Sequence, residues 1–148
     1  MLQIREAIKE DIPNLLELVT ELAIYEKAPN EVTNTKEMMV KDGFGKHKIY
    51  DAFVATLNQK IIGIAITYYR YSTWKGKCLY LEDLIVTEKH RGIGAGKLLF
   101  EKCIEFGKEQ KCLKMNWQVL DWNTPSIDFY KSYGADLDAE WVNGSLIL

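Results

Sequence analysis

One segment, residues 79–101, constrains the fold of this 148-residue chain more than any other. An apolar strand that ends with residues 84–86 leads through a short polar connection into the glycine-rich stretch 91–96. A strand that turns through glycines into the start of a helix presents free backbone N–H groups at the positive end of the helix dipole, and this arrangement binds phosphate. The segment therefore predicts a phosphate or pyrophosphate site. The helix that follows is amphipathic, with apolar positions at Leu98, Leu99, Ile104 and Phe106.

Spacing separates the phosphate loops that this segment could form. A Walker loop needs G-x-x-x-x-G-K-[ST], but Gly92 and Gly96 are one residue too close and Leu98 stands where the Mg²⁺-binding hydroxyl belongs. A dinucleotide loop needs G-x-G-x-x-G, and the third glycine comes one residue too soon. The remaining pattern, [RQ]-x-x-G-x-[GA], is met by Arg91, Gly94 and Gly96. It resembles the pyrophosphate loop of the GNAT N-acetyltransferases, which bind acetyl-coenzyme A. A glycine-rich turn that only caps a helix is the alternative.

Length and composition narrow the class of protein. A chain of this length predicts one domain, residues 1–148, with a single core. The net charge of −2 gives no reason to expect a nucleic-acid partner. No apolar run approaches the roughly 18 residues that span a membrane, so no membrane partner is expected, and the N-terminus has no signal-peptide form. Three cysteines without C-x-x-C spacing favour a reduced, cytoplasmic location, and two histidines give no metal site.

The pattern of apolar residues predicts an α+β fold: a mixed, mostly antiparallel central sheet with helices on both faces. Residues 51–57 and 60–71, separated by Asn58-Gln59, read as a hairpin, and the strands flanking the glycine-loop helix should lie parallel. Asn143-Gly144 predicts a second hairpin at the C-terminus. The predicted strands are 2–7, 51–57, 60–71, 79–86, 113–120 and the hairpin within 141–148. Four helices are predicted. The first begins near Asp11 and Pro13, and the second runs from a cap at Thr33 or Thr35 to about residue 42. The third covers about 94–109 and the fourth covers 121–133.

A second motif lies at residues 122–135. It resembles the C-terminal signature of the same family, N-x-P-[SA]-x-x-[FL]-Y. By that resemblance Asn123 and Ser126 contact coenzyme A and Tyr130 lies near its sulfur. The structural alternative is that Asn123 or Thr124 caps a helix, Pro125 suits its first turn, and Tyr130 is a core aromatic.

Beyond the two motifs, residues 21–32, 41–55, 68–86 and 122–135 resemble the spermidine/spermine (diamine) N-acetyltransferase branch of the GNAT family. The resemblance implies acetyl-coenzyme A as cosubstrate, a homodimer, and Tyr130 and Glu82 as catalytic residues. It implies acceptor-binding roles for Tyr25, Glu26, Trp74, Glu82 and Asp83. The implied cofactor-binding residues are Leu84, Ile85, Val86, Arg91, Gly92, Ile93, Gly94, Ala95, Gly96, Lys97, Asn123, Pro125, Ser126 and Tyr130.

Amine acetylation explains why these residue types are needed. An aliphatic amine with a pKa near about 10 must lose a proton before it attacks a thioester. Carboxylates such as Glu26, Glu82 and Asp83 bind the ammonium, and one of them accepts its proton directly or through water. A backbone N–H of strand 84–86 polarises the thioester carbonyl, and Tyr130 protonates the departing thiolate. Because adjacent residues of a strand point to opposite sides, only one of Glu82 and Asp83 should face the cleft.

The chain departs from the branch at Ser72-Thr73-Trp74, where polyamine acetyltransferases commonly have Asp-Pro-Trp, and in a shorter tail. The expected acceptor is therefore a small primary amine: a polyamine, a diamine, or a lysine- or thialysine-like amino acid. Alternatives are acetylation of a protein amine and a non-catalytic coenzyme A-binding module. An aromatic wall of Tyr68, Tyr69, Tyr71 and Trp74 favours a closed acceptor site over the open groove that a protein substrate needs.

Overall fold

A computed structural model describes residues 1–148 and has the expected α+β architecture. The chain forms two compact units, Met1–Trp117 and Gln118–Leu148. The prediction that residues 1–148 form one domain remains a prediction. In chain order the elements are β1 (Leu2–Glu6), η1 (Lys9–Asp11), α1 (Ile12–Tyr25), η2 (Pro29–Glu31), α2 (Lys36–Phe44), β2 (Asp51–Leu57), β3 (Lys60–Ser72), β4 (Gly76–Val86), η3 (Glu88–His90), α3 (Ala95–Glu109), β5 (Met115–Asn116) and α4 (Thr124–Lys131).

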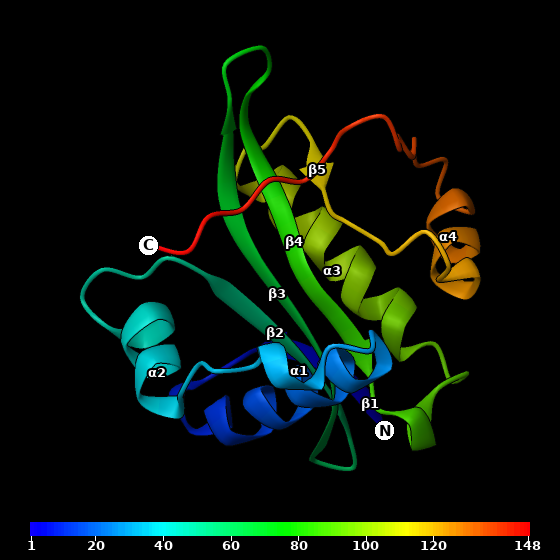
Figure 1. The fold of residues 1–148 in the computed structure, drawn as a ribbon. Helices are drawn as coiled ribbons and strands as arrows, with labels where there is room; N and C mark the ends of the chain where they lie inside the picture. The colour runs from blue at the N-terminus through cyan, green and yellow to red at the C-terminus, as the bar shows by residue number, and fades with distance from the viewer. The chain divides into compact units, whose positions relative to one another are not determined.

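The sheet of the first unit has the strand order β1-β2-β3-β4-β5. The first four strands pair antiparallel, and β5 pairs with β4 in parallel, which confirms the predicted pairing around the glycine-loop helix. Asn58 and Gln59 join β2 to β3 with φ angles of 49° and 70°, as the predicted two-residue hairpin turn requires. The β3–β4 hairpin is the longest feature of the sheet and reaches past the helices of this unit (Figure 1).

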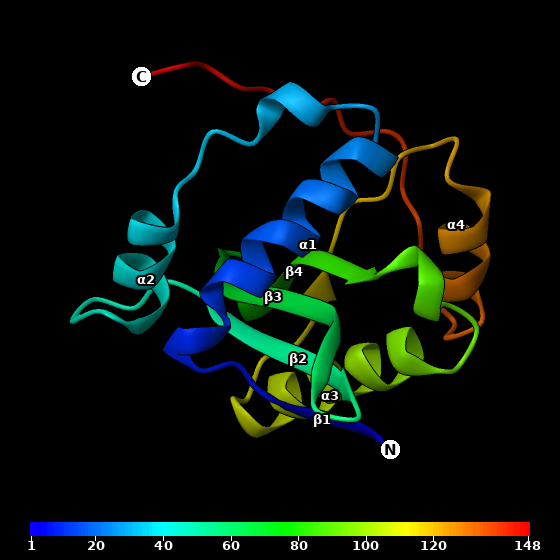
Figure 2. The ribbon, with the colours of Figure 1, turned by 90° about the horizontal axis from the view of Figure 1, so that it is seen from below.

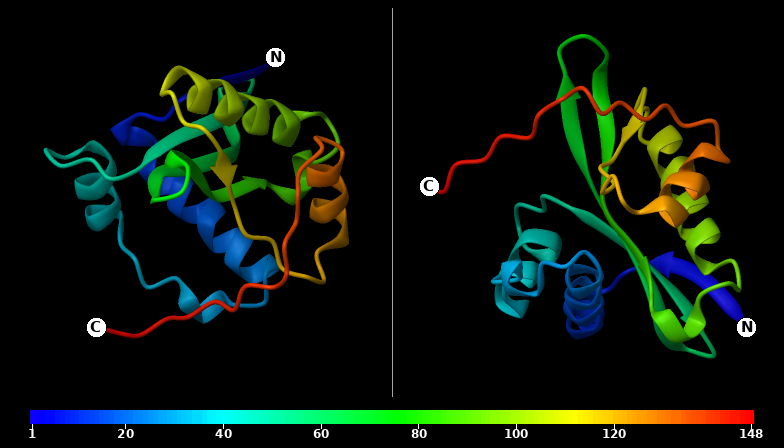
Figure 3. Two further views of the ribbon diagram at one scale, coloured as in Figure 1. Left: turned by 90° about the horizontal axis from the view of Figure 1, so that it is seen from above. Right: turned by 45° about the vertical axis from the view of Figure 1, so that its right-hand side comes forward.

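Helices α1 and α2 cover one face of the sheet and α3 covers the other (Figures 2 and 3). Side chains of β3 alternate between these faces. Ile64 and Ile66 pack with α1 in the main core, whereas on the opposite face Tyr69 stacks against Phe106 of α3. These two faces are called the α1 face and the α3 face.

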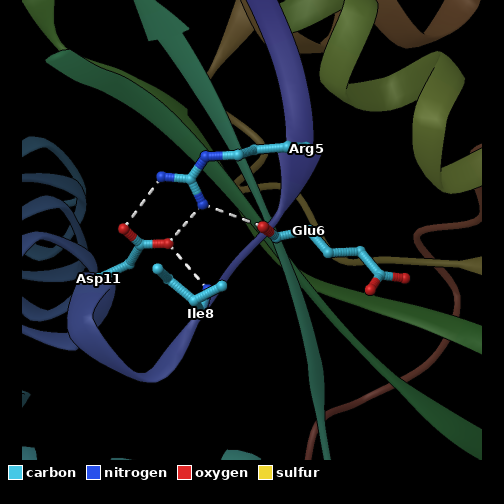
Figure 4. Close-up of polar contacts among 4 residues, drawn as sticks. All are labelled: Arg5, Glu6, Ile8 and Asp11. Carbon is cyan, nitrogen blue, oxygen red and sulfur yellow. Dashed lines mark hydrogen bonds and ion pairs between the residues drawn. The ribbon is translucent and has the colours of Figure 1, made fainter. Parts of the chain in front are cut away.

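A buried carboxylate fixes the start of α1. Arg5, at the end of β1, donates to Asp11 from Nη1 to Oδ2 at 2.7 Å and from Nη2 to Oδ1 at 3.1 Å (Figure 4). The backbone N–H of Ile8 donates to Oδ2 at 2.8 Å. Burial alone would raise the pKa of Asp11, but the bonds from Arg5 and Ile8 outweigh it and lower that pKa. Sheet and helix are thereby held together by a satisfied, charged contact.

A β-bulge interrupts the β3–β4 ladder near the middle of β4. Ile66 pairs with Asp83 and Thr67 pairs with Leu81, so Glu82 is the extra residue of β4. The strict alternation expected for Glu82 and Asp83 therefore does not hold here, because a bulge re-aims the side chains on either side of it.

Two sequence predictions about the C-terminal third are wrong. The strand expected at 113–120 contains only Met115–Asn116, and residues 141–148 form neither strand nor hairpin. Strand-forming residues need a half-buried surface, and an isolated two-stranded hairpin is marginal in water. The apolar side chains of the tail instead lie exposed, at Trp141, Val142, Leu146, Ile147 and Leu148. No helix of the chain has the length and apolar character required to span a bilayer.

Candidate active site

The glycine loop enters α3 as the sequence predicts. Gly92 and Gly94 have φ angles of 84° and 90°, in the left-handed region that favours glycine, and Gly94 is the residue before the helix. Leu98 donates the first helical bond, to the carbonyl of Gly94 at 3.0 Å. The amides of residues 95–97 consequently have no acceptor within the helix.

The space beside this helix start suits a phosphate group. A Cβ atom added at Gly92 or Gly94 would meet nothing within 4 Å, so a ligand can approach the backbone closely. Ile93 and Lys97 are exposed, whereas Ala95 is buried and anchors the first turn of the helix. The residues present therefore fit the pyrophosphate of coenzyme A, with the helix dipole favouring the negative charge.

Beyond the bulge, some backbone groups of β4 do not form hydrogen bonds to β3. Thr87 donates to Ile62 at 2.8 Å, which places the hydrogen-bonded pairs of this ladder at alternate residues. The peptide groups of Leu84 and Val86 consequently point to the opposite edge, where β5 pairs only with Leu79 and Tyr80. Ile85 differs from its two neighbours, because its backbone groups point toward Ile64 in a hydrogen-bonded pair and its side chain is buried in the core.

Three carboxylates meet at this edge, on the α1 face. Glu26 directly follows the end of α1, Glu82 is the exposed bulge residue, and Asp83 is half-buried opposite Ile66. Burial, followed by the negative charges of Glu82 and Glu26, raises the pKa of Asp83 to about 7. Burial and the charge of Glu82 also raise the pKa of Glu26. The structure thus gathers three of the predicted acceptor-site residues, and burial of Asp83, together with the two neighbouring negative charges, raises its pKa toward neutral pH.

Tyr25 completes α1 beside the glycine loop. Its ring lies 5.4 Å from the guanidinium carbon of Arg91, which also donates from Nε to the carbonyl of Val86 at 2.9 Å. The predicted acceptor residue Tyr25 and the predicted cofactor residue Arg91 therefore contact each other directly.

The predicted aromatic wall is wrong. Tyr68 lies on the α1 face, 5.1 Å from the ring of Tyr80, but Tyr69 stacks on the α3 face. Tyr71 and Trp74 are exposed on the β3–β4 hairpin, Trp74 at its tip with 86% of its surface accessible. Strand alternation sends neighbouring aromatics to opposite faces, so the four rings do not form one surface.

The second motif forms α4 in the second unit. The Oδ1 atom of Asn123 accepts from the backbone N–H of Ser126 at 3.4 Å, and Pro125 occupies the first turn. Tyr130 is buried and meets the ring of Phe129 edge-on at 5.5 Å. The predicted capping role of Asn123 is confirmed. The cofactor-binding role of Asn123, Pro125, Ser126 and Tyr130 remains a prediction.

Two features near the carboxylates escaped the sequence analysis. The bulge that brings Asp83 onto the α1 face depends on the pairing register, which no local pattern reveals. Arg70 lies on the same face, 5.8 Å above the ring of Tyr80. Its spacing of two from Tyr68 could have placed both on one side of β3.

Comparison with known proteins identifies the architecture. The acetyltransferase (GNAT) family model matches residues 15–135. Thialysine N-epsilon-acetyltransferase of Bos taurus is 38% identical over 140 residues, which cover 89% of this chain and 82% of that protein. Spermidine/spermine N(1)-acetyltransferase-like protein 1 of Homo sapiens is 34% identical over 146 residues, 93% of this chain and 21% of that protein.

Solved structures agree on the fold. An aminoglycoside acetyltransferase from an uncultured soil metagenomic sample superposes with a TM-score of 0.81 at 22% identity, covering 99% of this chain and 96% of that one. Family match, relatives and fold all point the same way. The chain belongs to the GNAT family of N-acetyltransferases, in the branch that resembles the thialysine and spermidine/spermine acetyltransferases.

Proposed function

We propose that this enzyme transfers the acetyl group of acetyl-coenzyme A to a small primary amine: a polyamine, a diamine, or a lysine- or thialysine-like amino acid. The observation that carries the proposal is the cluster of Glu26, Glu82 and Asp83 beside the outward peptide groups of Leu84 and Val86. Such a cluster attracts an ammonium group, and the neighbouring N–H groups can polarise a carbonyl. The relatives named for thialysine and for spermidine/spermine support the same class of acceptor.

Acetyl-coenzyme A supplies the acetyl thioester. The amides of Ala95, Gly96 and Lys97 at the start of α3, with Arg91 to Gly94 before them, bind its pyrophosphate. The edge of β4 from Leu84 to Val86 binds its acetyl and pantetheine groups. By the family resemblance, Asn123, Pro125 and Ser126 of α4 add further contacts.

The carboxylate pair Glu82 and Asp83 removes the proton from the acceptor. Transfer from an amine with a pKa near 10 to an ordinary carboxylate spans a pKa gap of about 6, roughly 8 kcal/mol. With the pKa of Asp83 raised to about 7, the gap falls to about 3, roughly 4 kcal/mol. Glu82, the exposed member, meets the ammonium, and Asp83 holds the proton.

The acetyl transfer itself proceeds by direct attack in a ternary complex. The acceptor nitrogen forms a bond to the acetyl carbon while the bond from that carbon to sulfur breaks. The acceptor nitrogen loses two protons in all: the ammonium proton, which Asp83 takes and passes to solvent before attack, and a second proton, which the Glu82–Asp83 pair takes up as the amide forms. Tyr130 gives its hydroxyl proton to the sulfur and regains a proton from solvent. No covalent link to the enzyme forms, so none of the three cysteines is needed as a nucleophile.

We also propose that the working enzyme is a homodimer. The apolar side chains of the tail from Trp141 to Leu148 are exposed, and a second copy would cover them. The family resemblance implies the same state.

Thiol release from acetyl-coenzyme A, measured across a panel of polyamines, diamines and basic amino acids, tests the proposed function. We expect amine-dependent release by the wild type and a large loss of kcat in Asp83→Asn. Lys60→Gln is the matched control, because Lys60 is exposed at the other end of the β3 strand. Tight binding of coenzyme A with no amine-dependent release would contradict the proposal and favour a binding module.

A further inference from the structure

A cavity of about 360 Å³ lies along the β3–β4 hairpin, next to β5. All of its lining residues belong to the first unit. Its charged lining residues are all basic: Arg70, Lys75 and Lys114. None of the three forms an ion pair with a carboxylate of the chain, since the ion pairs are Arg5–Asp11, Lys48–Asp51 and Lys102–Glu105. The cavity thus presents uncompensated positive charge, and Trp74 lines it at the hairpin tip.

This cavity and the carboxylate cluster lie along one face of the sheet. Arg70 pairs with Cys78 and Tyr68 pairs with Tyr80, so these residues share the α1 face with Asp83. Burial raises the pKa values of Tyr68 and Tyr80, the charge of Glu82 raises both further, and the charge of Arg70 lowers both. The two tyrosine rings therefore lie between a negative end at Glu82 and a positive end at Arg70.

The separation of the two ends suits a short bifunctional molecule. Asp83 is opposite Ile66, and Arg70 is four residues further along β3, about 13 Å of strand. The Arg70 guanidinium carbon lies 5.8 Å from the ring of Tyr80, the strand residue two positions before Glu82. An extended basic amino acid likewise has opposite charges at its two ends, its side-chain ammonium at one and its carboxylate at the other.

We propose that Arg70 binds the carboxylate of an amino-acid acceptor whose side-chain amine lies at Glu82 and Asp83, making Arg70 a specificity-determining residue. This inference rests on the proposed amine acetyltransferase activity and narrows it to acceptors that carry a negative group. An arginine fork matches a carboxylate with two parallel hydrogen bonds, and Arg70 has no carboxylate partner within the chain. A polyamine would instead bring an ammonium against three basic side chains, which costs affinity.

Two acceptors that differ only in this group test the inference: L-lysine and L-lysinamide. For the wild type we expect a higher kcat/KM with L-lysine. Arg70→Gln should lower kcat/KM for L-lysine about tenfold, through KM, while that for L-lysinamide stays within about twofold. Arg70→Lys should restore part of the loss, and Arg70→Glu should make L-lysinamide the better acceptor. Lys60→Gln, which removes one positive charge from the same strand, should leave kcat/KM for both acceptors unchanged.

The outcomes separate this inference from the proposed function. An equal loss for both acceptors in Arg70→Gln would assign Arg70 the structural role of supporting Tyr80 and overturn the inference, as would no loss for either. If the wild type acetylates a polyamine or diamine but neither of these two acceptors, the inference fails and the proposed function stands. If it acetylates no amine at all, the proposed function fails. Calorimetric titration of the coenzyme A complex with the same two acceptors then decides the role of Arg70. Binding of L-lysine that is stronger than that of L-lysinamide and lost in Arg70→Gln supports it, and equal affinities overturn it.

Discussion

Arg91 donates a hydrogen bond from Nε to the carbonyl oxygen of Val86 at 2.9 Å and thereby ties the glycine loop to the last residue of β4. The same guanidinium lies 5.4 Å from the ring of Tyr25 at the end of α1. Because the peptide group of Val86 points away from β3, the contact also holds the edge of β4 toward the loop. Arg91 thus joins the acceptor side of the site to the cofactor side.

Replacing Arg91 should weaken coenzyme A binding. In Arg91→Gln the tether to Val86 is weakened and a positive charge beside the phosphate-binding loop is lost, so we expect Kd for coenzyme A to rise about tenfold. Calorimetry at two salt concentrations measures the change. Lys89→Gln is the control, since Lys89 is an exposed residue of the same connection. Equal effects of the two substitutions would reduce Arg91 to a general electrostatic contribution.

The raised pKa of Asp83 predicts the pH dependence of the reaction. As the proton acceptor, Asp83 must be ionised, so kcat/KM for the amine should rise as the pH increases through about 7. Glu82→Gln removes a negative charge that raises this pKa, so the rise should move to lower pH. Glu26→Gln should move it in the same direction and by less, because Glu82 has the larger effect. A profile that is unchanged in both variants would exclude Asp83 as the titrating group.

The contribution of Asp83 to the free energy of unfolding should fall as the pH rises, whereas kcat/KM should increase. The folded pKa of about 7 exceeds the unfolded value, so Asp83 favours folding at low pH, and this contribution is lost as pH rises through about 7. Because the loss starts near the unfolded pKa of about 3.9 and is complete above about 7, Asp83→Asn should raise Tm more at pH 8 than at pH 5, while it lowers kcat. Thermal unfolding at both values checks this. A lower Tm at pH 8 would show that Asp83 is needed for packing and not held at a cost for function.

Tyr130 is the proposed acid, and Tyr130→Phe isolates its hydroxyl group. With chemistry rate-limiting and both substrates saturating, we expect kcat to fall by about 10²–10⁴-fold with a modest change in KM. Tyr133→Phe is the matched control, because Tyr133 also packs against Phe129 near the end of α4. A folded Tyr130→Phe enzyme with normal kcat would make Tyr130 a core aromatic only.

Local signals in the sequence were sufficient for most of the first unit. The turn residues Asn58 and Gln59, the cap at Thr35 and the apolar runs of β2 and β3 each act within a few residues, and each prediction is confirmed. The tail is different. Its apolar residues and Asn143-Gly144 resemble a hairpin, but a strand needs a partner surface that these residues do not contain.

In the candidate site, too, some features follow from local sequence and others depend on the tertiary structure. The glycine loop and α4 were found from their motifs because each motif is local. The grouping of Glu26 with Glu82 and Asp83, and the facing of Tyr68 by Tyr80, depends on strand register, a bulge and the end point of α1. The prediction of an aromatic wall was wrong because neighbouring residues of a strand point to opposite faces of the sheet.

The exposed tail predicts how the proposed dimer forms. Removing residues 141–148 deletes five exposed apolar side chains, Trp141, Val142, Leu146, Ile147 and Leu148. We expect the full chain to scatter light as a dimer at micromolar concentration and the shortened chain to be a monomer. A control that replaces only Glu140 by Ala should leave the dimer intact. A monomeric full chain would contradict the proposed homodimer.

Ser72 predicts how acceptor choice can be changed. Its Oγ accepts from the backbone N–H groups of Trp74 and Lys75 at 3.2 and 3.1 Å, which shapes the tip of the hairpin, and it lines the same cavity as Arg70. An aspartate can accept the same two bonds, so Ser72→Asp should fold normally. It would also restore the carboxylate that polyamine acetyltransferases commonly have here.

The added charge should redirect the enzyme from basic amino acids toward polyamines. Beside Arg70 and Lys75 the new carboxylate competes with that of the acceptor, so KM for L-lysine should rise, whereas a distal ammonium of spermine gains a partner and its KM should fall. We expect the ratio of kcat/KM for spermine to that for L-lysine to increase about tenfold, with kcat little changed. Ser72→Asn is the control, because it keeps the two backbone bonds without the charge. A wild type that already prefers spermine strongly, or a ratio that moves equally in the Asp and Asn variants, would show that charge at position 72 does not select the acceptor.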